Sequence, residues 1–319
     1  MGSEPLLLGV DLGGTKIEAA LVSSNGEFVH RKRCATPVAD YPLLLSKISA
    51  LCDSLENSAG LGAPLPLGIC TPGSPSPANG LMRNCNSTVL NGQLLQQDLE
   101  NVSGRAVRIA NDADCLVLSE AIDGAGHGAR SVFGVIIGTG VGGGLFINNA
   151  LLQGPNAVSG EWGHNAMPLE RISDLAPELV RPRPCYCGRQ NCIETWLSGP
   201  GLALTHEQLH KQSINVAMLS SEAIDGPHSQ TISTYIQMLA AALAGVVNVV
   251  DPEVIVLGGG LSNIELIYKS TPDLIRSQVL SDVCRTKIYA AQHGDSSGIR
   301  GAARLWQHGE TPSYIEVPA

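Results

Sequence analysis

Residues 6–29 read LLLGVDLGGTKIEAALVSSNGEFV, and residues 131–154 read SVFGVIIGTGVGGGLFINNALLQG. Each stretch runs from an apolar strand through a glycine-rich turn into a second strand, and then through a turn containing Asn into a third. Asn25-Gly26 between apolar runs is a strong hairpin signal. An order of elements that recurs about one domain length later indicates an internal repeat. The sequence therefore predicts an α/β chain with two domains of related topology; a chance likeness of two hairpins is the alternative.

Further elements follow from the patterns around these stretches. Apolar residues at helical spacing predict helices over 41–57 and 229–249. The apolar runs PLGIC (66–70) and VIVL (254–257) predict buried strands, whereas TPGSPSPANG (71–80) is predicted to be a loop. We place a domain boundary after residue 115, which gives a small N-terminal domain (residues 1–115) and a larger C-terminal domain (residues 116–295). A final helix over 296–310 is expected to join the first domain.

The composition limits the class of protein. A chain of 319 residues, 44% hydrophobic and 15% charged, suits two ordinary domains with a sizeable core. The net charge of −9 disfavours a nucleic-acid-binding surface, which is usually basic. No apolar run approaches the roughly 20 residues that span a bilayer, and the first residues lack the basic region of a signal peptide. The nine cysteines are mostly single in apolar segments, which predicts a cytoplasmic protein with free thiols.

Three glycine-rich turns each follow an apolar strand, at residues 11–16, 138–144 and 258–260. Glycines let the backbone approach a phosphate closely, and their N–H groups can bind its oxygens. Threonine hydroxyls and a lysine add donors, and an aspartate at a strand end could hold a metal ion through water. The predicted phosphate-binding residues are Asp11, Gly13, Gly14, Thr15, Lys16, Gly138, Thr139, Gly140, Gly258, Gly259 and Gly260.

Glycine-rich turns of this kind also occur in other classes of site. Any single turn could be only a tight hairpin. The chain has no G-x-x-x-x-G-K-[ST] segment, which excludes a P-loop. Gly138, Gly140 and Gly143 match the dinucleotide pattern G-x-G-x-x-G, but that pattern must open a helix, whereas GLFINNALL (144–152) has strand character and a turn. A Rossmann dehydrogenase is therefore disfavoured.

Five motifs occur together and in order: DLGGTK (11–16), IANDADC (109–115), GTGVGGG (138–144), EWGH (161–164) and CYCGRQNCIE (185–194). In this combination the chain resembles, over essentially its whole length, the ROK family of bacterial sugar kinases and repressors, within the actin-like ATPase superfamily. NSTVLNG (86–92) and HGDSSGIRGAA (293–303) are similar to the bacterial fructokinase/mannokinase branch. Asn191 stands where the cysteine motif of the family usually has glycine. Because Asn tolerates a left-handed turn next best, we expect the site to be intact.

The resemblance implies two actin-like (ribonuclease H-like, ASKHA) α/β domains with the active site in the cleft between them. It also implies ATP as phosphoryl donor with Mg²⁺, a structural Zn²⁺, and a homodimer. The expected partners are a hexose substrate and ATP, with neither nucleic acid nor membrane.

Asp112, which follows the apolar strand VRIA (107–110), is the predicted catalytic base. A sugar hydroxyl is a poor nucleophile, and a carboxylate within hydrogen-bond reach can orient it and accept its proton. From the residues alone an Asn-Asp pair could equally cap a helix. The match to the kinase motif assigns the role of base to Asp112, and we interpret Asp114 as a cap. The sugar-binding residues implied by motif match are Gly73, Asn86, Asn111, Asp112, Glu161, His164 and Glu194; Glu194 could instead be a surface helix residue.

Cys185, Cys187 and Cys192 place three thiols within eight residues. Tetrahedral zinc needs a fourth ligand, and the nearest upstream imidazole is His164, where the family also has a histidine. Four protein ligands leave no open position, so the predicted zinc is structural and fixes EWGH beside the sugar. A disulfide is the main alternative and conflicts with a cytoplasmic chain.

The predicted function is ATP-dependent phosphorylation of a hexose, preferably fructose (or mannose), to the 6-phosphate. N-acetylglucosamine kinase is the alternative, because it shares every core motif with fructokinase, as do N-acetylmannosamine kinase and glucokinase. A sugar-responsive ROK transcription regulator is disfavoured, because its helix-turn-helix domain would precede the first strand, where only about five residues stand. The cysteine cluster and Asp112 disfavour a non-catalytic actin-like assembly protein.

Overall fold

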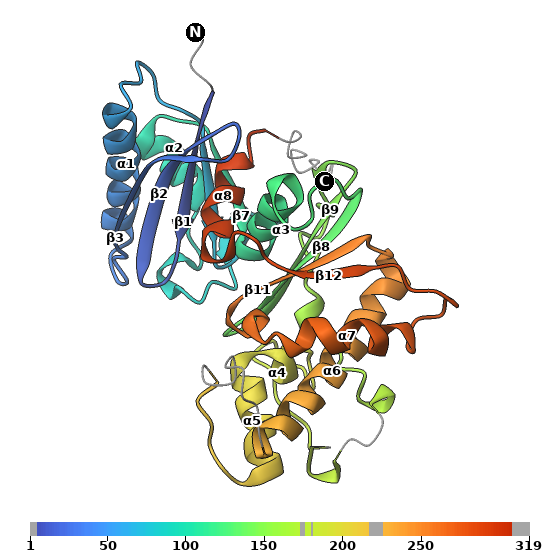
Figure 1. The fold of residues 1–319 in the computed structure, drawn as a ribbon. Coiled ribbons are helices and arrows are strands. Elements are labelled where there is room, and N and C mark those ends of the chain that lie inside the picture. The colour runs from blue at the N-terminus through green and yellow to red at the C-terminus, as the bar shows by residue number, and fades with distance from the viewer. Residues whose placement is uncertain (1–4, 173–175, 180, 217–225, 308–319) are drawn as a thin grey trace.

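The computed structural model describes residues 5–172, 176–179, 181–216 and 226–307. Two five-stranded sheets lie on either side of a central pair of helices, α3 (Asp112–Asp123) and α8 (Ser297–Arg304), as Figure 1 shows. The other long helices cover the outer faces of the two sheets. The mixed α/β class predicted from the sequence is confirmed.

Both sheets have the same strand arrangement. The first has the order β3 (Phe28–Ala35), β2 (Lys16–Ser23), β1 (Leu6–Leu12), β4 (Leu67–Thr71), β7 (Val107–Asn111). The second has the order β10 (Ala150–Leu151), β9 (Val141–Ile147), β8 (Ser131–Ile137), β11 (Val254–Gly258), β12 (Lys287–Ala290). In each sheet the first three strands form an antiparallel meander and the next two pair in parallel. The internal repeat predicted from the two hairpins is therefore confirmed.

The remaining helices are α1 (Tyr41–Ser58), α2 (Leu95–Ser103), α4 (Glu194–Leu197), α5 (Gly199–His210), α6 (Pro227–Val250) and α7 (Leu266–Arg276). The helix α1 begins where Asp40 Oδ1 accepts a hydrogen bond of 2.9 Å from the backbone N–H of Leu43. Its buried residues Leu44, Ile48 and Leu55 recur at helical spacing and belong to the core of the first sheet. In the segment predicted to be a loop, the structure adds a short ladder between β5 (Ser74–Pro75) and β6 (Met82–Arg83).

The helix α6 corrects the expectation that no apolar stretch reaches membrane-spanning length. By length and composition its 24 residues could cross a bilayer. In the structure, however, 61% of its most apolar stretch is buried, and residues such as Ile236, Leu239 and Leu243 join the core of the second sheet. This is the environment of a core helix.

Paired glycines bring α8 close to the first sheet. Gly9 of β1 lies beside Gly68 of β4 in the parallel register. A Cβ atom at Gly68 would stand 1.8 Å from the carbonyl oxygen of Ala302, and one at Gly9 would stand 2.5 Å from that of Ile299. Only glycine at these positions lets the helix backbone rest on the strands.

The second sheet also has paired glycines that let a helix, α3, approach closely. Gly134 of β8 pairs with Gly144 of β9, and a Cβ atom at Gly144 would stand 2.7 Å from the carbonyl oxygen of Ala113. The two helices then meet at Gly301, where a Cβ atom would stand 1.9 Å from the carbonyl oxygen of Cys115. The proposed domain boundary after residue 115 falls inside α3, and the division into domains stays a proposal.

A buried carboxylate also joins α3 to the segment before α8. Glu120 is fully buried, and its carboxylate accepts hydrogen bonds of 2.9–3.0 Å from the backbone N–H groups of Ala125, Gln292 and His293 and from the hydroxyl of Ser297. Four donors satisfy the carboxylate, as a buried charge requires. The start of α8 is thereby held against α3.

Candidate active site

The three predicted phosphate-binding turns lie at the carboxyl ends of β1, β8 and β11. The turn after β1 closes through a 3.0 Å hydrogen bond from Gly13 N–H to Lys16 C=O, and Gly14, Thr15 and Lys16 are exposed. The strands β8 and β11 are parallel neighbours, so the turns at 138–140 and 258–260 lie next to each other. The carboxyl ends of parallel strands are where α/β proteins bind their ligands.

Some of these glycines face open space and others are needed for packing. Nothing stands within 4 Å of where a Cβ atom would be at Gly14, Gly138 and Gly260, which leaves room for a ligand. Gly259 has a φ of +84°, and a Cβ atom there would stand 2.5 Å from the carbonyl oxygen of Ile137. At Gly258 a Cβ atom would stand 2.3 Å from the side chain of Leu116. Gly258 therefore packs against the side chain of Leu116 on α3. Thr139 is exposed between Gly138 and Gly140.

Asp112 is the first residue of α3, and Asn111 caps the helix. Asn111 Oδ1 accepts a 2.7 Å hydrogen bond from the N–H of Asp114, so the interpretation of Asp114 as the cap was wrong. The reason is that the helix begins two residues before Asp114. The cap occupies the oxygen of the Asn111 side chain and leaves its NH₂ group as a donor.

The electrostatic surroundings of Asp112 suit a proton acceptor. Asp112 is exposed to solvent although many protein atoms surround its carboxylate. Desolvation raises the pKa of Asp112 to about 6, and the charges of Asp11 and Glu161 contribute to the rise. Asp11 lies at the end of β1, and burial raises its pKa as well. The carboxylates of Asp11 and Asp112, at the carboxyl ends of two strands of the first sheet, thus lie near each other.

The EWGH motif forms a short 3₁₀ turn, Trp162–His164, that rests on the start of β9. The indole N–H of Trp162 donates a 2.9 Å hydrogen bond to the carbonyl of Gly142, and a Cβ atom at Gly163 would stand 2.1 Å from the carbonyl oxygen of Val141. This attachment places Glu161 and His164 beside the 138–140 turn. Glu161 is exposed and close enough to Asp112 for its charge to raise the pKa of that residue.

Glu194 opens α4, and one oxygen of its carboxylate is already engaged. Oε2 accepts a 3.0 Å hydrogen bond from the N–H of Val141, and a Cβ atom at Gly140 would stand 2.7 Å from the same oxygen. Glu194 therefore holds the glycine turn in place. The alternative that it is a free surface residue does not hold.

The predicted metal ligands lie together. His164, Cys185, Cys187 and Cys192 each offer a ligand atom within 4.8 Å of the others. His164 Nδ1 lies 3.6 Å from Cys185 Sγ, and the sulfurs of Cys187 and Cys192 are 3.6 Å apart, far beyond the roughly 2.05 Å of a disulfide. Asn191 has a φ of +56°, so the left-handed turn expected at this position is confirmed.

The chemistry of this donor set fits zinc. Three thiols and one imidazole match a closed Cys₃His site. A hydrogen bond from the backbone N–H of Arg189 is the main cause of a lowered pKa at Cys187, whereas desolvation raises the pKa of Cys185 and of Cys192. The same loop carries Tyr186, which sequence reasoning missed although it stands between two of the ligands. Partial burial and the charges of Glu194 and Glu161 raise the pKa of Tyr186 to about 12, so its hydroxyl stays protonated.

Gly73 and Asn86 lie on the other side of the cleft. Gly73 is buried, and a Cβ atom there would stand 2.4 Å from the carbonyl oxygen of Arg83. Asn86 is exposed, in a loop that Asn91 fixes through 3.0 Å hydrogen bonds to both backbone groups of Cys85. The structure thus gives Gly73 a packing role and leaves Asn86 open to a ligand.

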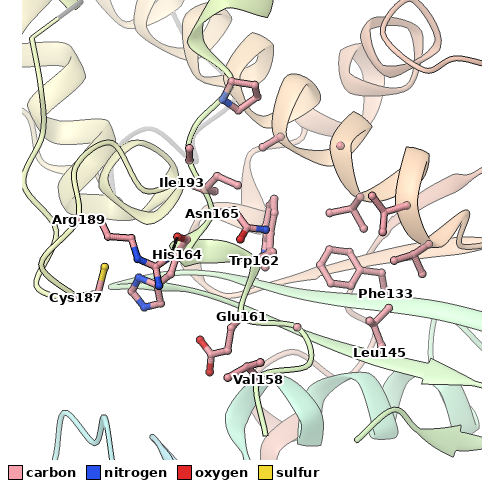
Figure 2. Close-up of a pocket in the computed structure, with 18 of the residues that line it drawn as sticks. Phe133, Leu145, Val158, Glu161, Trp162, His164, Asn165, Cys187, Arg189 and Ile193 are labelled. Atoms are coloured by element: carbon pink, nitrogen blue, oxygen red, sulfur yellow. Dashed lines mark hydrogen bonds between the residues drawn. The ribbon is translucent and has the colours of Figure 1, made fainter. Parts of the chain in front are cut away.

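A cavity of about 890 Å³ lies beside the EWGH turn (Figure 2). Glu161, His164 and Arg189 stand on one side of it, and Phe133 and Leu145 form an apolar wall opposite. Further lining residues that sequence reasoning missed are Val158, Asn165 and Tyr186. Of the predicted sugar-binding residues, Glu161 and His164 line this cavity, whereas Asp112 and Glu194 lie outside its described lining.

Comparison with known proteins agrees with this geometry. A family model described as "ROK family" matches residues 7–309. The N-acetyl-D-glucosamine kinase of Vibrio atlanticus (strain LGP32) is 39% identical over 303 residues, 93% of this chain and 98% of the relative. That of Yersinia pseudotuberculosis serotype O:3 (strain YPIII) is 36% identical over 299 residues, 93% of this chain and 97% of the relative. A ROK family glucokinase from Streptomyces griseus, solved in complex with glucose and AMPPNP, is similar with a TM-score of 0.73 at 26% identity, over 94% of this chain and 99% of that chain.

Proposed function

The chain belongs to the ROK family, and from this premise we propose that it is an ATP-dependent kinase that phosphorylates the 6-hydroxyl of N-acetylglucosamine. The observation that carries the proposal is the position of Asp112. Its carboxylate lies at the start of α3, electrostatically close to Asp11 at the first glycine turn and to Glu161 of the EWGH motif. A base between a phosphate site and a sugar site is the arrangement that phosphoryl transfer to an alcohol requires.

The glycine turns would hold the nucleotide. Support comes from the open space at Gly14, Gly138 and Gly260 and from the exposed Lys16. The Streptomyces glucokinase was solved with an ATP analogue, which supports a nucleotide donor in this fold. Asp11 would hold Mg²⁺ through water, and Mg²⁺ when bound neutralises charge on the phosphate oxygens.

Asp112 would act on the sugar hydroxyl. With a pKa of about 6 it is ionised at neutral pH and can accept the proton of the hydroxyl as the sugar oxygen bonds to the γ-phosphorus. The bond between the γ-phosphorus and the bridging oxygen breaks, and ADP leaves with the electron pair. The NH₂ group of Asn111 is left by the cap as a donor that can orient the same hydroxyl.

The choice of hexose departs from the sequence prediction. Fructose or mannose was preferred on NSTVLNG and HGDSSGIRGAA, but the relatives that match over nearly the whole chain are named N-acetyl-D-glucosamine kinases. They support the alternative. We propose that Glu161, His164 and Glu194 bind the end of the sugar away from the 6-hydroxyl, and that Gly73 and Asn86 approach it from the first domain.

We further propose that His164, Cys185, Cys187 and Cys192 hold a structural Zn²⁺. The closed set of four ligands supports a structural ion, since no position is left for substrate. Zinc at this site would fix His164 and the EWGH turn beside the sugar. A homodimer stays a prediction from the family resemblance, and a cytoplasmic location stays a prediction from the single cysteines.

The test is ADP release coupled to a dye-linked assay, with N-acetylglucosamine, N-acetylmannosamine, glucose, mannose and fructose as acceptors. Wild type should give the highest kcat/KM with N-acetylglucosamine. Asp112→Asn should lower kcat by about a hundred- to ten-thousandfold, because the proton acceptor is lost. Asp282→Asn, at an exposed aspartate in the segment before β12, is the matched control and should keep full activity. Near-normal kcat in Asp112→Asn would remove this residue from the mechanism, and a higher kcat/KM with fructose would restore the original specificity.

A further inference from the structure

Tyr186 occupies an unusual position for a residue inside a metal-binding loop. It stands between Cys185 and Cys187, is 73% exposed, and lines the cavity beside Glu161 and His164. Its ring meets the imidazole of His164 edge-on, with centroids 5.1 Å apart and planes at 88°. Its hydroxyl oxygen lies 2.9 Å from His164 Nε2. An exposed aromatic side chain held in this way forms part of the wall of the cavity.

The two nitrogens of His164 determine the direction of this hydrogen bond. Nδ1 faces the cysteines, 3.6 Å from Cys185 Sγ, so zinc would take Nδ1 as its ligand. A metal-bound imidazole carries its remaining proton on the other nitrogen. Nε2–H then donates to the oxygen of Tyr186, and the hydroxyl proton of Tyr186 must find another acceptor. With zinc on Nδ1 of His164, Tyr186 would therefore present its O–H as a donor to the cavity.

Two carboxylates stand near Tyr186 in this part of the cavity. Tyr186 lies within electrostatic reach of the carboxylates of Glu161 and Glu194. Carboxylates bind sugar hydroxyls and amide N–H groups, but they repel a carbonyl oxygen. The guanidinium of Arg189 is engaged by the carbonyl oxygen of His164 at 3.1 Å. A ligand carbonyl at this end of the sugar site can take a hydrogen bond from the hydroxyl of Tyr186, beside the remaining N–H groups of Arg189.

An acetamido group matches these features. It carries an N–H for a carboxylate, a carbonyl oxygen for a hydroxyl donor, and a methyl group that can pack on an aromatic ring. Resting on the proposed function, we propose that Tyr186 is a specificity-determining residue whose O–H donates to the acetamido carbonyl of the substrate and whose ring contacts the acetamido methyl. Glucose, which has a hydroxyl in place of the acetamido group, gains nothing from this contact.

Calorimetric titration of the zinc-containing protein without nucleotide tests the inference independently of turnover. Wild type, Tyr186→Phe and Tyr289→Phe are each titrated with N-acetylglucosamine and with glucose, and zinc is measured per chain. Tyr289 is an exposed tyrosine on β12 and serves as the matched control. Tyr186→Phe should weaken binding of N-acetylglucosamine about three- to tenfold, the range for one hydrogen bond. Its affinity for glucose should change by less than about twofold, with zinc content equal to wild type.

The possible outcomes separate the two proposals. Equal weakening for both sugars, or no weakening for N-acetylglucosamine, would overturn the role of Tyr186 in specificity. Loss of zinc in Tyr186→Phe would make its role structural and would overturn the inference as well. If wild type binds N-acetylglucosamine but transfers no phosphate, the proposed kinase function fails while the effect of Tyr186 on binding is still decided. Absence of binding to wild type would overturn both.

Discussion

Replacing Gly301 by alanine tests whether the close approach of α3 and α8 holds the protein together. A Cβ atom at this position would stand 1.9 Å from the carbonyl oxygen of Cys115 and 2.5 Å from its carbonyl carbon. Carbon and oxygen atoms normally stay about 3.3 Å apart, so the two helices would have to separate by roughly 1.4 Å. Overpacking of this kind costs about 1–3 kcal/mol, and the high end applies because a backbone group cannot rotate away. Alanine regains about 1 kcal/mol of helix propensity, which leaves a net loss of about 2 kcal/mol.

Gly245 supplies the matched control. It also lies inside a helix, α6, but nothing stands within 4 Å of where its Cβ atom would be. Gly245→Ala should therefore raise the free energy of unfolding by about 0.5–1 kcal/mol through propensity alone. Urea unfolding followed by tryptophan fluorescence measures both variants. The changes in the free energy of unfolding are expected to have opposite signs in the two variants. A Gly301→Ala protein as stable as wild type would refute the packing argument.

The same variant reports on the site. Because α3 begins with Asp112, a separation of the two helices moves the carboxylate relative to Asp11 at the end of β1. A misplacement of about 1 Å can lower a rate by about a hundredfold. We expect kcat of Gly301→Ala to fall at least tenfold at temperatures where the protein is still folded.

Four further predictions concern charge and metal. If Asp112 is the base, kcat/KM should fall as the pH drops through about 6, because protonation of its carboxylate removes the proton acceptor. A kcat/KM that stays constant from pH 8 to 5 would contradict the role of Asp112 as base. The pKa of Asp112 is higher in the folded protein than its ordinary 3.8, so ionisation of this carboxyl opposes folding above about pH 6. Asp112→Asn should therefore melt at a higher temperature than wild type at pH 7.5. Scanning calorimetry should show that this difference in melting temperature is gone at pH 4. Removal of zinc by a chelator should weaken sugar binding before it lowers the melting temperature. The metal site would be refuted if elemental analysis of untreated protein gave well under one zinc per chain. Glu120→Ala should lower the free energy of unfolding by about 3 kcal/mol or more, because four hydrogen-bond donors lose their acceptor. A change below about 1 kcal/mol in urea unfolding would be inconsistent with the hydrogen bonds described for Glu120.

Much of the fold could be predicted because its elements carry local signals. The two hairpins were identified by their glycine turns, and the sheets have the predicted repeated order. Asn191 was expected in a left-handed turn and has a φ of +56°. The pairing of Gly9 with Gly68 could not be predicted, because it depends on the register between strands almost 60 residues apart in the sequence. The interior position of α6 also depends on tertiary packing, since its composition alone is compatible with a membrane.

The candidate site was predictable where chemistry is concentrated in a motif. The cysteines with His164 lie together as the spacing suggested. The cap of α3 was assigned to the wrong residue because the start of a helix is fixed by backbone geometry, which sequence defines only within a few residues. Tyr186 was missed because a single aromatic residue carries no spacing signal. The relatives support N-acetylglucosamine, which the sequence prediction held as the alternative, since short stretches such as NSTVLNG do not by themselves define the shape of a sugar site.

The position of α8 has a consequence for synthesis of the chain on the ribosome. The inner face of the first sheet, with Ala20 and Val22 on β2, is covered by Ile299 and Ala303 of α8. Those residues leave the ribosome more than 270 residues after the strand that they cover. Until then the nascent sheet keeps an apolar face uncovered, which invites chaperone binding or aggregation. The N-terminal half therefore cannot finish folding until α8, the last described helix, has been synthesised. A nascent chain that ends before residue 297 should bind chaperones instead of becoming protease-resistant.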